Sequence, residues 1–176
     1  PNDFRGFNNL GKVQYQQGDY DAAMASFKKA ARLDGNAPES QMNQGLVALV
    51  NNDLRAANNS FGKAAGLNDL NPALGLLYLK QGDVKAAVKA FGDDKSNNAA
   101  LAQILTKDYS KAKSTLGAIN NPDAMTYYLT AVLGARTNND KMVSSNLRQA
   151  VKLDRTLATR AMNDLEFKNF NPSTIL

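Results

Sequence analysis

The chain has 176 residues, of which 43% are hydrophobic and 21% charged, with a net charge of +5. This length and composition suit one soluble domain or two small ones. The absence of Cys and His excludes disulfides and thiolate chemistry and removes the commonest general base and metal ligand. The 21 Lys and Arg residues alternate with 16 acidic residues rather than clustering, so no nucleic-acid partner is expected. No stretch reaches the ~18 consecutive apolar residues of a transmembrane segment.

A sequence pattern typical of two helices joined by a turn recurs along the chain. The segment QQGDYDAAMASFKKA at 16–30 has a counterpart in QGDVKAAVKAF at 81–91. Placing Asp19 on Asp53, an offset of 34 residues, also superposes Gly11 on Gly45, Ala23 on Ala57, Phe27 on Phe61, Ala30 on Ala64 and Leu33 on Leu67. Shorter copies follow at Asp83 and Asp108, and a looser one spans 137–154. The chain is therefore predicted to be an array of one small helical unit.

Each recurring residue has a physical role in such a unit. The Ala, and the Gly of the preceding helix (Gly11, Gly45 and Gly75), are small where two helices cross closely. The Phe or Leu four residues after the Ala fills the gap between neighbouring units. In the turn, Gly or Asn tolerates the left-handed conformation that ends one helix, and Asp caps the start of the next.

In chain order, the predicted helix pairs are 4–17 with 20–34, 38–51 with 54–67, 72–81 with 83–91, 97–106 with 108–117, and 122–137 with 140–153. A further helix over 155–168 carries an apolar stripe of Leu157, Ala161 and Leu165 and is expected to cap the last unit. Phe167 and Phe170 lie off this stripe. They are expected to fold back on the last helix pair, with a contact to another subunit as the alternative. Residues 171–176 are expected to form a loose tail.

The segment FNNLGKVQYQQGDYDAAMASFKKAARLD at 7–34 resembles a tetratricopeptide repeat (TPR). The matching positions are Leu10, Gly11, Tyr20, Ala23, Phe27 and Ala30. Phe7 replaces the usual Trp, and Gly35 replaces the usual closing Pro. The resemblance extends, with increasing degeneracy, over repeats at 4–37, 38–70, 71–92, 96–118 and 122–154 of one domain at 4–170. It implies an all-α, right-handed superhelix of about five helix pairs with a C-terminal capping helix.

The residues indicate no catalytic, cofactor or metal site, and we expect that the protein is not an enzyme. The paired acids Asp93 and Asp94 follow Gly92 in a tight loop, where solvated turn residues are the usual interpretation. Ser and Thr are plentiful but lack the His or Cys that would activate them, and no Gly-rich loop has phosphate-binding spacing.

The resemblance instead implies a binding groove, because the first helix of each TPR pair lines the concave surface. The residues placed there are Asn8, Lys12, Tyr15, Asn43, Leu46, Leu49, Leu76, Leu79, Leu101, Ile104, Tyr128 and Arg136. Of the residues with which peptide-binding TPRs clamp a terminal carboxylate, only Asn43 is matched, so that clamp is not expected here. The alternative for the apolar positions is that the short helices turn them into the core.

The expected function is a protein-interaction scaffold that holds a peptide or a helix of a partner protein. The alternative is a structural spacer or a weak self-association module without a specific ligand. The Asn-rich turns and the short segment 91–105 also resemble TPR segments of Gram-negative cell-envelope proteins. This second resemblance implies a periplasmic or outer-membrane-associated location, with the cytoplasm as the alternative.

Overall fold

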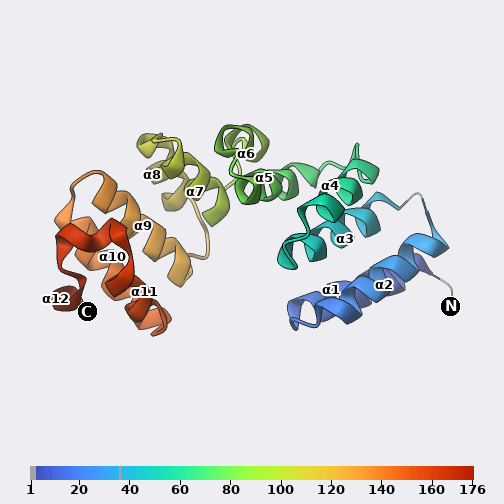
Figure 1. Ribbon diagram of the computed structural model, residues 1–176, viewed down its shortest axis with the longest axis horizontal. Coiled ribbons are helices and arrows are strands. Elements are labelled where there is room, and N and C mark those ends of the chain that lie inside the picture. The colour runs from blue at the N-terminus through green and yellow to red at the C-terminus, as the bar shows by residue number, and fades with distance from the viewer. Residues whose placement is uncertain (1–2, 36) are drawn as a thin grey trace. The chain divides into compact units, whose positions relative to one another are not determined.

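The computed structural model describes residues 3–35 and 37–176, and these residues form twelve α-helices and one 3-10 helix without any strand (Figure 1). The all-α prediction is confirmed. Contacts within the chain gather into two units, residues 1–91 and residues 92–176. None of the described helices combines the length and apolar content needed to cross a bilayer.

Unit 1 consists of three helix pairs. They are α1 (Phe4–Gln16) with α2 (Tyr20–Leu33), α3 (Pro38–Val50) with α4 (Leu54–Lys63), and α5 (Leu70–Gln81) with α6 (Val84–Phe91). Within each pair the helices pack on each other, and the second helix of one pair also packs on the first helix of the next. This nearest-neighbour stacking is how repeat arrays bury their apolar surface.

The three predicted glycines lie where the two helices of a pair come closest. A Cβ atom added to Gly45 would lie 2.4 Å from Cε1 of Phe61. Gly11 faces Phe27 and Gly75 faces Phe91 in the same way, at 2.6 and 2.7 Å. The phenylalanine ring thus occupies the space where a side chain would otherwise stand, and the small-residue prediction is confirmed at all three crossings.

The turns also follow the predicted chemistry. Gly18, Asn52 and Gly82 have positive φ, at 82°, 57° and 80°. The Asp that follows each of them accepts a hydrogen bond from the backbone N–H three residues on. The backbone thus ends one helix in the left-handed region and caps the next within two residues.

Unit 2 begins with two short helices, α7 (Asn97–Leu105) and α8 (Tyr109–Gly117). The longer pair α9 (Ala124–Arg136) and α10 (Asp140–Leu153) comes next. The chain then ends in three short elements: α11 (Leu157–Asn163), the 3-10 helix η1 (Leu165–Phe170) and α12 (Pro172–Ile175). One apolar cluster joins all of these elements, and Leu133, Val143 and Leu147 lie at its centre.

The C-terminal segment differs from the single helix predicted at 155–168. The α-helix ends at Asn163 because Asp164 is extended, and the Asp164 side chain accepts hydrogen bonds from the Glu166 N–H and the Tyr128 hydroxyl. The break changes the register of the residues after it. Leu165, expected in the buried stripe, is 84% exposed, and Phe167 is fully buried instead. Phe167 packs edge-on against Tyr128, so the prediction that it folds back on the last helix pair is confirmed.

The end of the chain is helical rather than a loose tail. Pro172 opens α12, and the carbonyl of Ile175 accepts a hydrogen bond from Nε of Arg148 on α10 at 2.9 Å. Ile175 also packs on the apolar cluster of unit 2. Helix α9 begins at Ala124, two residues later than the predicted start at 122, because Asp123 caps it.

Candidate functional site

A pocket of unit 2 with a mostly apolar lining lies against α7 and α9, and we call it the α7–α9 pocket. Its volume is about 420 Å³. It is lined by Asn97, Asn98, Leu101, Ile104, Leu105, Met125, Tyr128, Leu129, Val132, Arg136, Arg160, Asp164 and Glu166. Six of these residues are aliphatic or Met, and the charged ones all belong to the C-terminal ends of α9 and α11 or to the segment just after α11. The pocket therefore has an apolar floor and a charged rim on one side.

The two helices that line the pocket are tied together at their N-terminal ends. Ser96 caps α7, and Asp123 caps α9 in a capping box with Thr126. Nδ2 of Asn97 donates to Oδ1 of Asp123 at 3.0 Å. Burial opposes ionisation of Asp123, but hydrogen bonds from the Thr126 N–H and from Asn97 prevail and lower the pKa of this carboxyl below its ordinary value.

The two helices that line the pocket differ in length. Helix α7 has nine residues and α9 has thirteen. Because the two helices start together, α9 extends past α7 by about four residues, or ~6 Å at 1.5 Å per residue. Arg136, the last residue of α9, lies on this overhang and faces the segment after α11 rather than α7.

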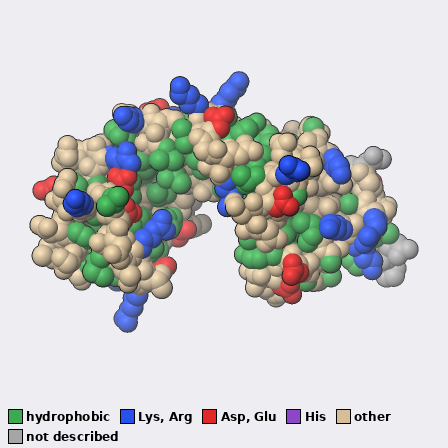
Figure 2. Space-filling model, viewed as in Figure 1, with side chains coloured by type: hydrophobic (Ala, Val, Ile, Leu, Met, Phe, Trp, Pro, Cys, Tyr) green, Lys and Arg blue, Asp and Glu red, His purple; other side chains and the backbone are tan. Residues whose placement is uncertain are grey.

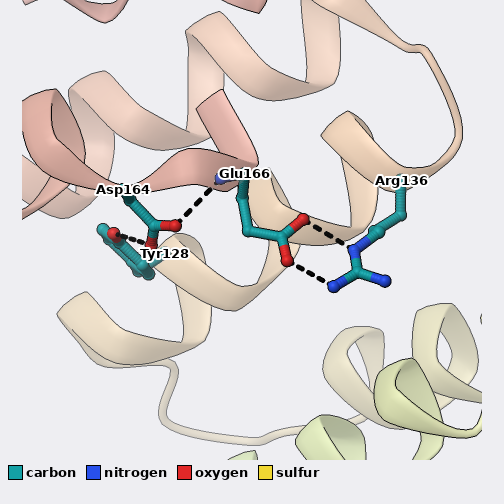
Figure 3. A network of polar contacts seen from close by, with 4 residues as sticks. All are labelled: Tyr128, Arg136, Asp164 and Glu166. Atoms are coloured by element: carbon teal, nitrogen blue, oxygen red, sulfur yellow. Dashed lines mark hydrogen bonds and ion pairs between the residues drawn. The ribbon is translucent and has the colours of Figure 1, made fainter. Parts of the chain in front are cut away.

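Three residues of the charged rim, Asp164, Glu166 and Arg136, are linked to Tyr128 of the floor by the polar contacts that Figure 3 shows. The Tyr128 hydroxyl donates to Oδ2 of Asp164 at 2.6 Å, and Oδ1 of the same carboxylate accepts from the Glu166 N–H at 3.0 Å. The Glu166 carboxylate in turn accepts two hydrogen bonds from the Arg136 guanidinium, one of them from Nε at 2.6 Å. The hydrogen bond with Glu166 raises the pKa of Arg136, so this side chain stays charged.

Tyr128 forms part of the pocket floor and is only 1% exposed. Burial, together with its hydrogen bond to Asp164, raises the pKa of the Tyr128 hydroxyl well above its ordinary value. The Arg160 guanidinium lies 5.0 Å from the centre of the Tyr128 ring, within the range of a cation–π contact. The aromatic ring is therefore held between a cation and the apolar core.

Asn97 contributes an acceptor without a partner. Its Oδ1 atom is buried, and no donor among the described residues bonds to it. A buried acceptor left without a hydrogen bond costs about 1–3 kcal/mol.

Four of the predicted groove residues line the α7–α9 pocket: Leu101, Ile104, Tyr128 and Arg136. Ile104 and Tyr128 are each 1% exposed and form its floor, and Leu101 is half-buried. Sequence reasoning missed Arg160, Asp164 and Glu166, which lie off the apolar stripe of the predicted capping helix. The break in the helix at Asp164 turns Asp164 and Glu166 towards α9. No local feature of the sequence predicts this break.

Four further predicted residues line a smaller pocket in unit 1, of about 190 Å³: Lys12, Tyr15, Asn43 and Leu46. Burial, and then the neighbouring Tyr20, raise the pKa of Tyr15. Asn43 is buried and donates from Nδ2 to Oδ1 of Asn8 at 2.9 Å, so these two amides serve the contact between α1 and α3. The sequence analysis placed both side chains in the binding groove, whereas in the structure they bond to each other.

The remaining predicted groove residues lie nearer the core of unit 1. Leu49 is 1% exposed and belongs to an apolar cluster with Phe61 and Leu77. Leu49 is therefore a core residue, which is the alternative that the sequence analysis gave for the apolar groove positions. Leu76 and Leu79 are half-buried.

The paired acids in the loop after α6 have ordinary structural partners. Asp93 lies 3.5 Å from Nζ of Lys111, and Asp94 accepts from the Ser96 hydroxyl at 2.6 Å. Across residues 3–35 and 37–176, no three potential ligands gather in a way that would hold a metal ion.

In the view of Figure 2, Lys and Arg side chains are scattered among acidic and neutral ones, as their alternation in the sequence predicts.

Comparison with known proteins agrees with this architecture. The tetratricopeptide repeat family matches residues 4–36. No curated protein matches the chain in sequence.

Solved structures with the same fold cover most of the chain. YrrB, described as a TPR protein with an unusual peptide-binding site, is 23% identical, with a TM-score of 0.59 over 90% of this chain and 91% of its own. The APC/C hetero-tetramer Cut9–Hcn1 contains a chain that is 16% identical, with a TM-score of 0.80 over all of this chain and 36% of its own. A thermophilic TPR protein of Thermus thermophilus is also 16% identical, with a TM-score of 0.69 over 89% of this chain and 96% of its own. Residues 4–36 are thus a tetratricopeptide repeat, and the chain has the helical-repeat fold of TPR proteins.

Proposed function

We propose that the protein is a non-enzymatic interaction scaffold that binds a segment of a partner protein in the α7–α9 pocket. The observation that carries this proposal is the pocket itself. The pocket of about 420 Å³ is large enough for one or two side chains, and six of its thirteen lining residues are aliphatic or Met. A peptide that presents an apolar side chain matches this lining.

The fold supports the same conclusion. TPR proteins are protein-interaction modules, and one protein of this fold, YrrB, has a peptide-binding site. The bound segment is expected to insert a Leu-, Met- or Phe-sized side chain against Leu101, Leu105 and Val132. The carboxylates of Asp164 and Glu166 already have partners on the rim, and so does Arg136. Apolar contact is therefore expected to supply most of the affinity.

Peptides selected from a random display library against the whole protein provide the test. Leu105→Asp is the informative variant, because Leu105 lines the pocket and is 44% exposed, so the change spares the core. We expect it to weaken binding of the selected peptides at least tenfold, or about 1.4 kcal/mol. Leu153→Asp is the matched control. This leucine is 52% exposed on α10 of the same unit and does not line the pocket. Equal binding by both variants would place the peptide site elsewhere.

A further inference from the structure

The first helix of unit 1 has an apolar face that the other described residues leave uncovered. Leu10 and Val13 on α1 are 47% and 49% exposed. They lie one turn apart on the same side of the helix, because residues three apart are neighbours on a helix surface. Exposed apolar side chains are common singly, so the question is whether this pair has a specific complement.

The other repeats show what kind of surface covers this position. Shifted by the offsets that align the turns, Val13 corresponds to Val47 on α3 and to Leu77 on α5. Both of these residues are completely buried, whereas Val13 is half exposed. The same position of the repeat is thus covered in the second and third pairs and left open in the first.

The covering surface has the same chemistry in both cases. Val47 packs in a cluster with Ala23 and Phe27 of the preceding helix α2. Leu77 belongs to the cluster that contains Ala57 and Phe61 of the preceding helix α4. A helix with Ala followed four residues later by Phe therefore covers the position, with the Ala allowing close approach and the Phe filling the gap.

A second copy of this chain has no such surface free. The Ala and Phe of each pair in unit 1 are already buried: Ala23 with Phe27, Ala57 with Phe61, and Ala87 with Phe91 are all at most 6% exposed. In unit 2 the equivalent Val143 and Leu147 are fully buried in a cluster that includes Leu157 and Ala161 of α11. The complement must come from a different helical repeat.

We propose that the Leu10–Val13 face of α1 is a docking surface for a further helix pair, one whose second helix carries Ala and a large apolar residue four positions later. The partner is recognised by the geometry of the repeat. Its second helix packs on α1 in the same way that α2 packs on α3, and it buries Val13 as α2 buries Val47.

A tandem duplication of residues 3–36 in the full chain tests this proposal. It places a copy of α2 ahead of the original α1, with the connection and the Asp3 cap that a natural repeat would have. We expect one cooperative urea transition with a higher midpoint and a larger m value, because m scales with the surface exposed on unfolding. Val13→Asp in the original repeat is expected to change the midpoint little in the parent chain and to remove the gain in the duplicated chain.

The control is the same duplication with Phe27→Asp in the added copy alone, which is expected to abolish the gain. An added copy that leaves the midpoint and m value unchanged would overturn the proposal. So would equal effects of Val13→Asp in the parent and duplicated chains. Sedimentation of the parent chain completes the test: we expect a monomer, and a dimer that Val13→Asp dissociates would identify a second copy as the occupant and refute a further repeat.

Discussion

The guanidinium of Arg136 donates two hydrogen bonds to the carboxylate of Glu166, thirty residues further along the chain. This pair joins the end of α9 to the 3-10 helix, and both residues line the α7–α9 pocket. Together with the hydrogen bond between Tyr128 and Asp164, it fixes the C-terminal segment against α9 beside the proposed binding site.

A double-mutant cycle measures this pair. The two side chains are 35% and 28% exposed, so the ion pair is neither fully screened nor deeply buried. We expect a coupling free energy of about 0.5–1.5 kcal/mol between Arg136→Gln and Glu166→Gln, the upper end reflecting two-point geometry. Urea unfolding of the parent, both single variants and the double variant gives the value. Strict additivity of the two changes would show that the pair adds nothing to stability.

A methyl group at a helix crossing is expected to be costly. Gly45→Ala places a Cβ atom 2.4 Å from the Phe61 ring, which must move within a packed core. Overpacking costs about 1–3 kcal/mol, and this exceeds the ~1 kcal/mol that Ala contributes to helix propensity. We therefore expect a lower melting temperature.

Gly6→Ala is the matched control for this crossing, because it lies in a helix with no atom within 4 Å of the new Cβ. It is expected to raise the melting temperature slightly. Destabilisation of similar size by the two changes would contradict the packing role of Gly45.

The turn between α7 and α8 contains a strained residue. Lys107 has a φ of 64°, where the equivalent positions of unit 1 have Gly or Asn. A side chain with Cβ costs about 1–2 kcal/mol in the left-handed region. Lys107→Gly is accordingly expected to stabilise the protein by about 1 kcal/mol, as measured by urea unfolding. The reverse kind of change, Gly82→Ala at a φ of 80°, is expected to destabilise it. A loss of stability in Lys107→Gly would mean that the lysine side chain makes a compensating contact.

Tyr128 is expected to make the free energy of unfolding depend on pH in the alkaline range. Burial and the hydrogen bond to Asp164 raise the pKa of Tyr128 above its ordinary value of 10.0. Between these two pKa values the folded state retains a proton that the unfolded state releases, so the stabilisation is complete below pH 10 and declines as the pH rises above it. Unfolding free energies at pH 9, 10 and 11 are expected to fall less steeply in Tyr128→Phe than in the parent. Parallel slopes would show that the hydroxyl ionises as freely when folded as when unfolded.

Leu49 and Leu79 occupy corresponding positions of neighbouring repeats but are expected to behave differently. Leu49 is 1% exposed, so Leu49→Ala leaves a cavity and is expected to cost about 2–5 kcal/mol. Leu79 is half-buried, and Leu79→Ala is expected to cost about 1 kcal/mol because less apolar surface is lost. Chemical denaturation of both variants checks the ranking. Losses of equal size would show that the two leucines are core residues to the same degree.

The repeating unit, the helix pairs and the chemistry of their turns can all be derived from the sequence alone. Gly11, Gly45 and Gly75 could be assigned to helix crossings in this way, because the residues that meet there recur at the same spacing in each repeat. Capping by Asp19, Asp53 and Asp83 was equally predictable, since a cap involves only residues within one turn. Local rules suffice for features that are built locally.

The candidate site, in contrast, depends on tertiary contacts. The extended backbone at Asp164 moves Leu165 outward and Phe167 inward, and it aligns Glu166 with Arg136. These contacts join residues about thirty or more positions apart, and they depend on where the end of α9 lies in space. A helical period describes which face a residue occupies, but it carries no information about which distant segment will cover that face. The position of Arg136 beyond the end of α7 also follows from the difference in length between α7 and α9, which has this effect only because the two helices start together.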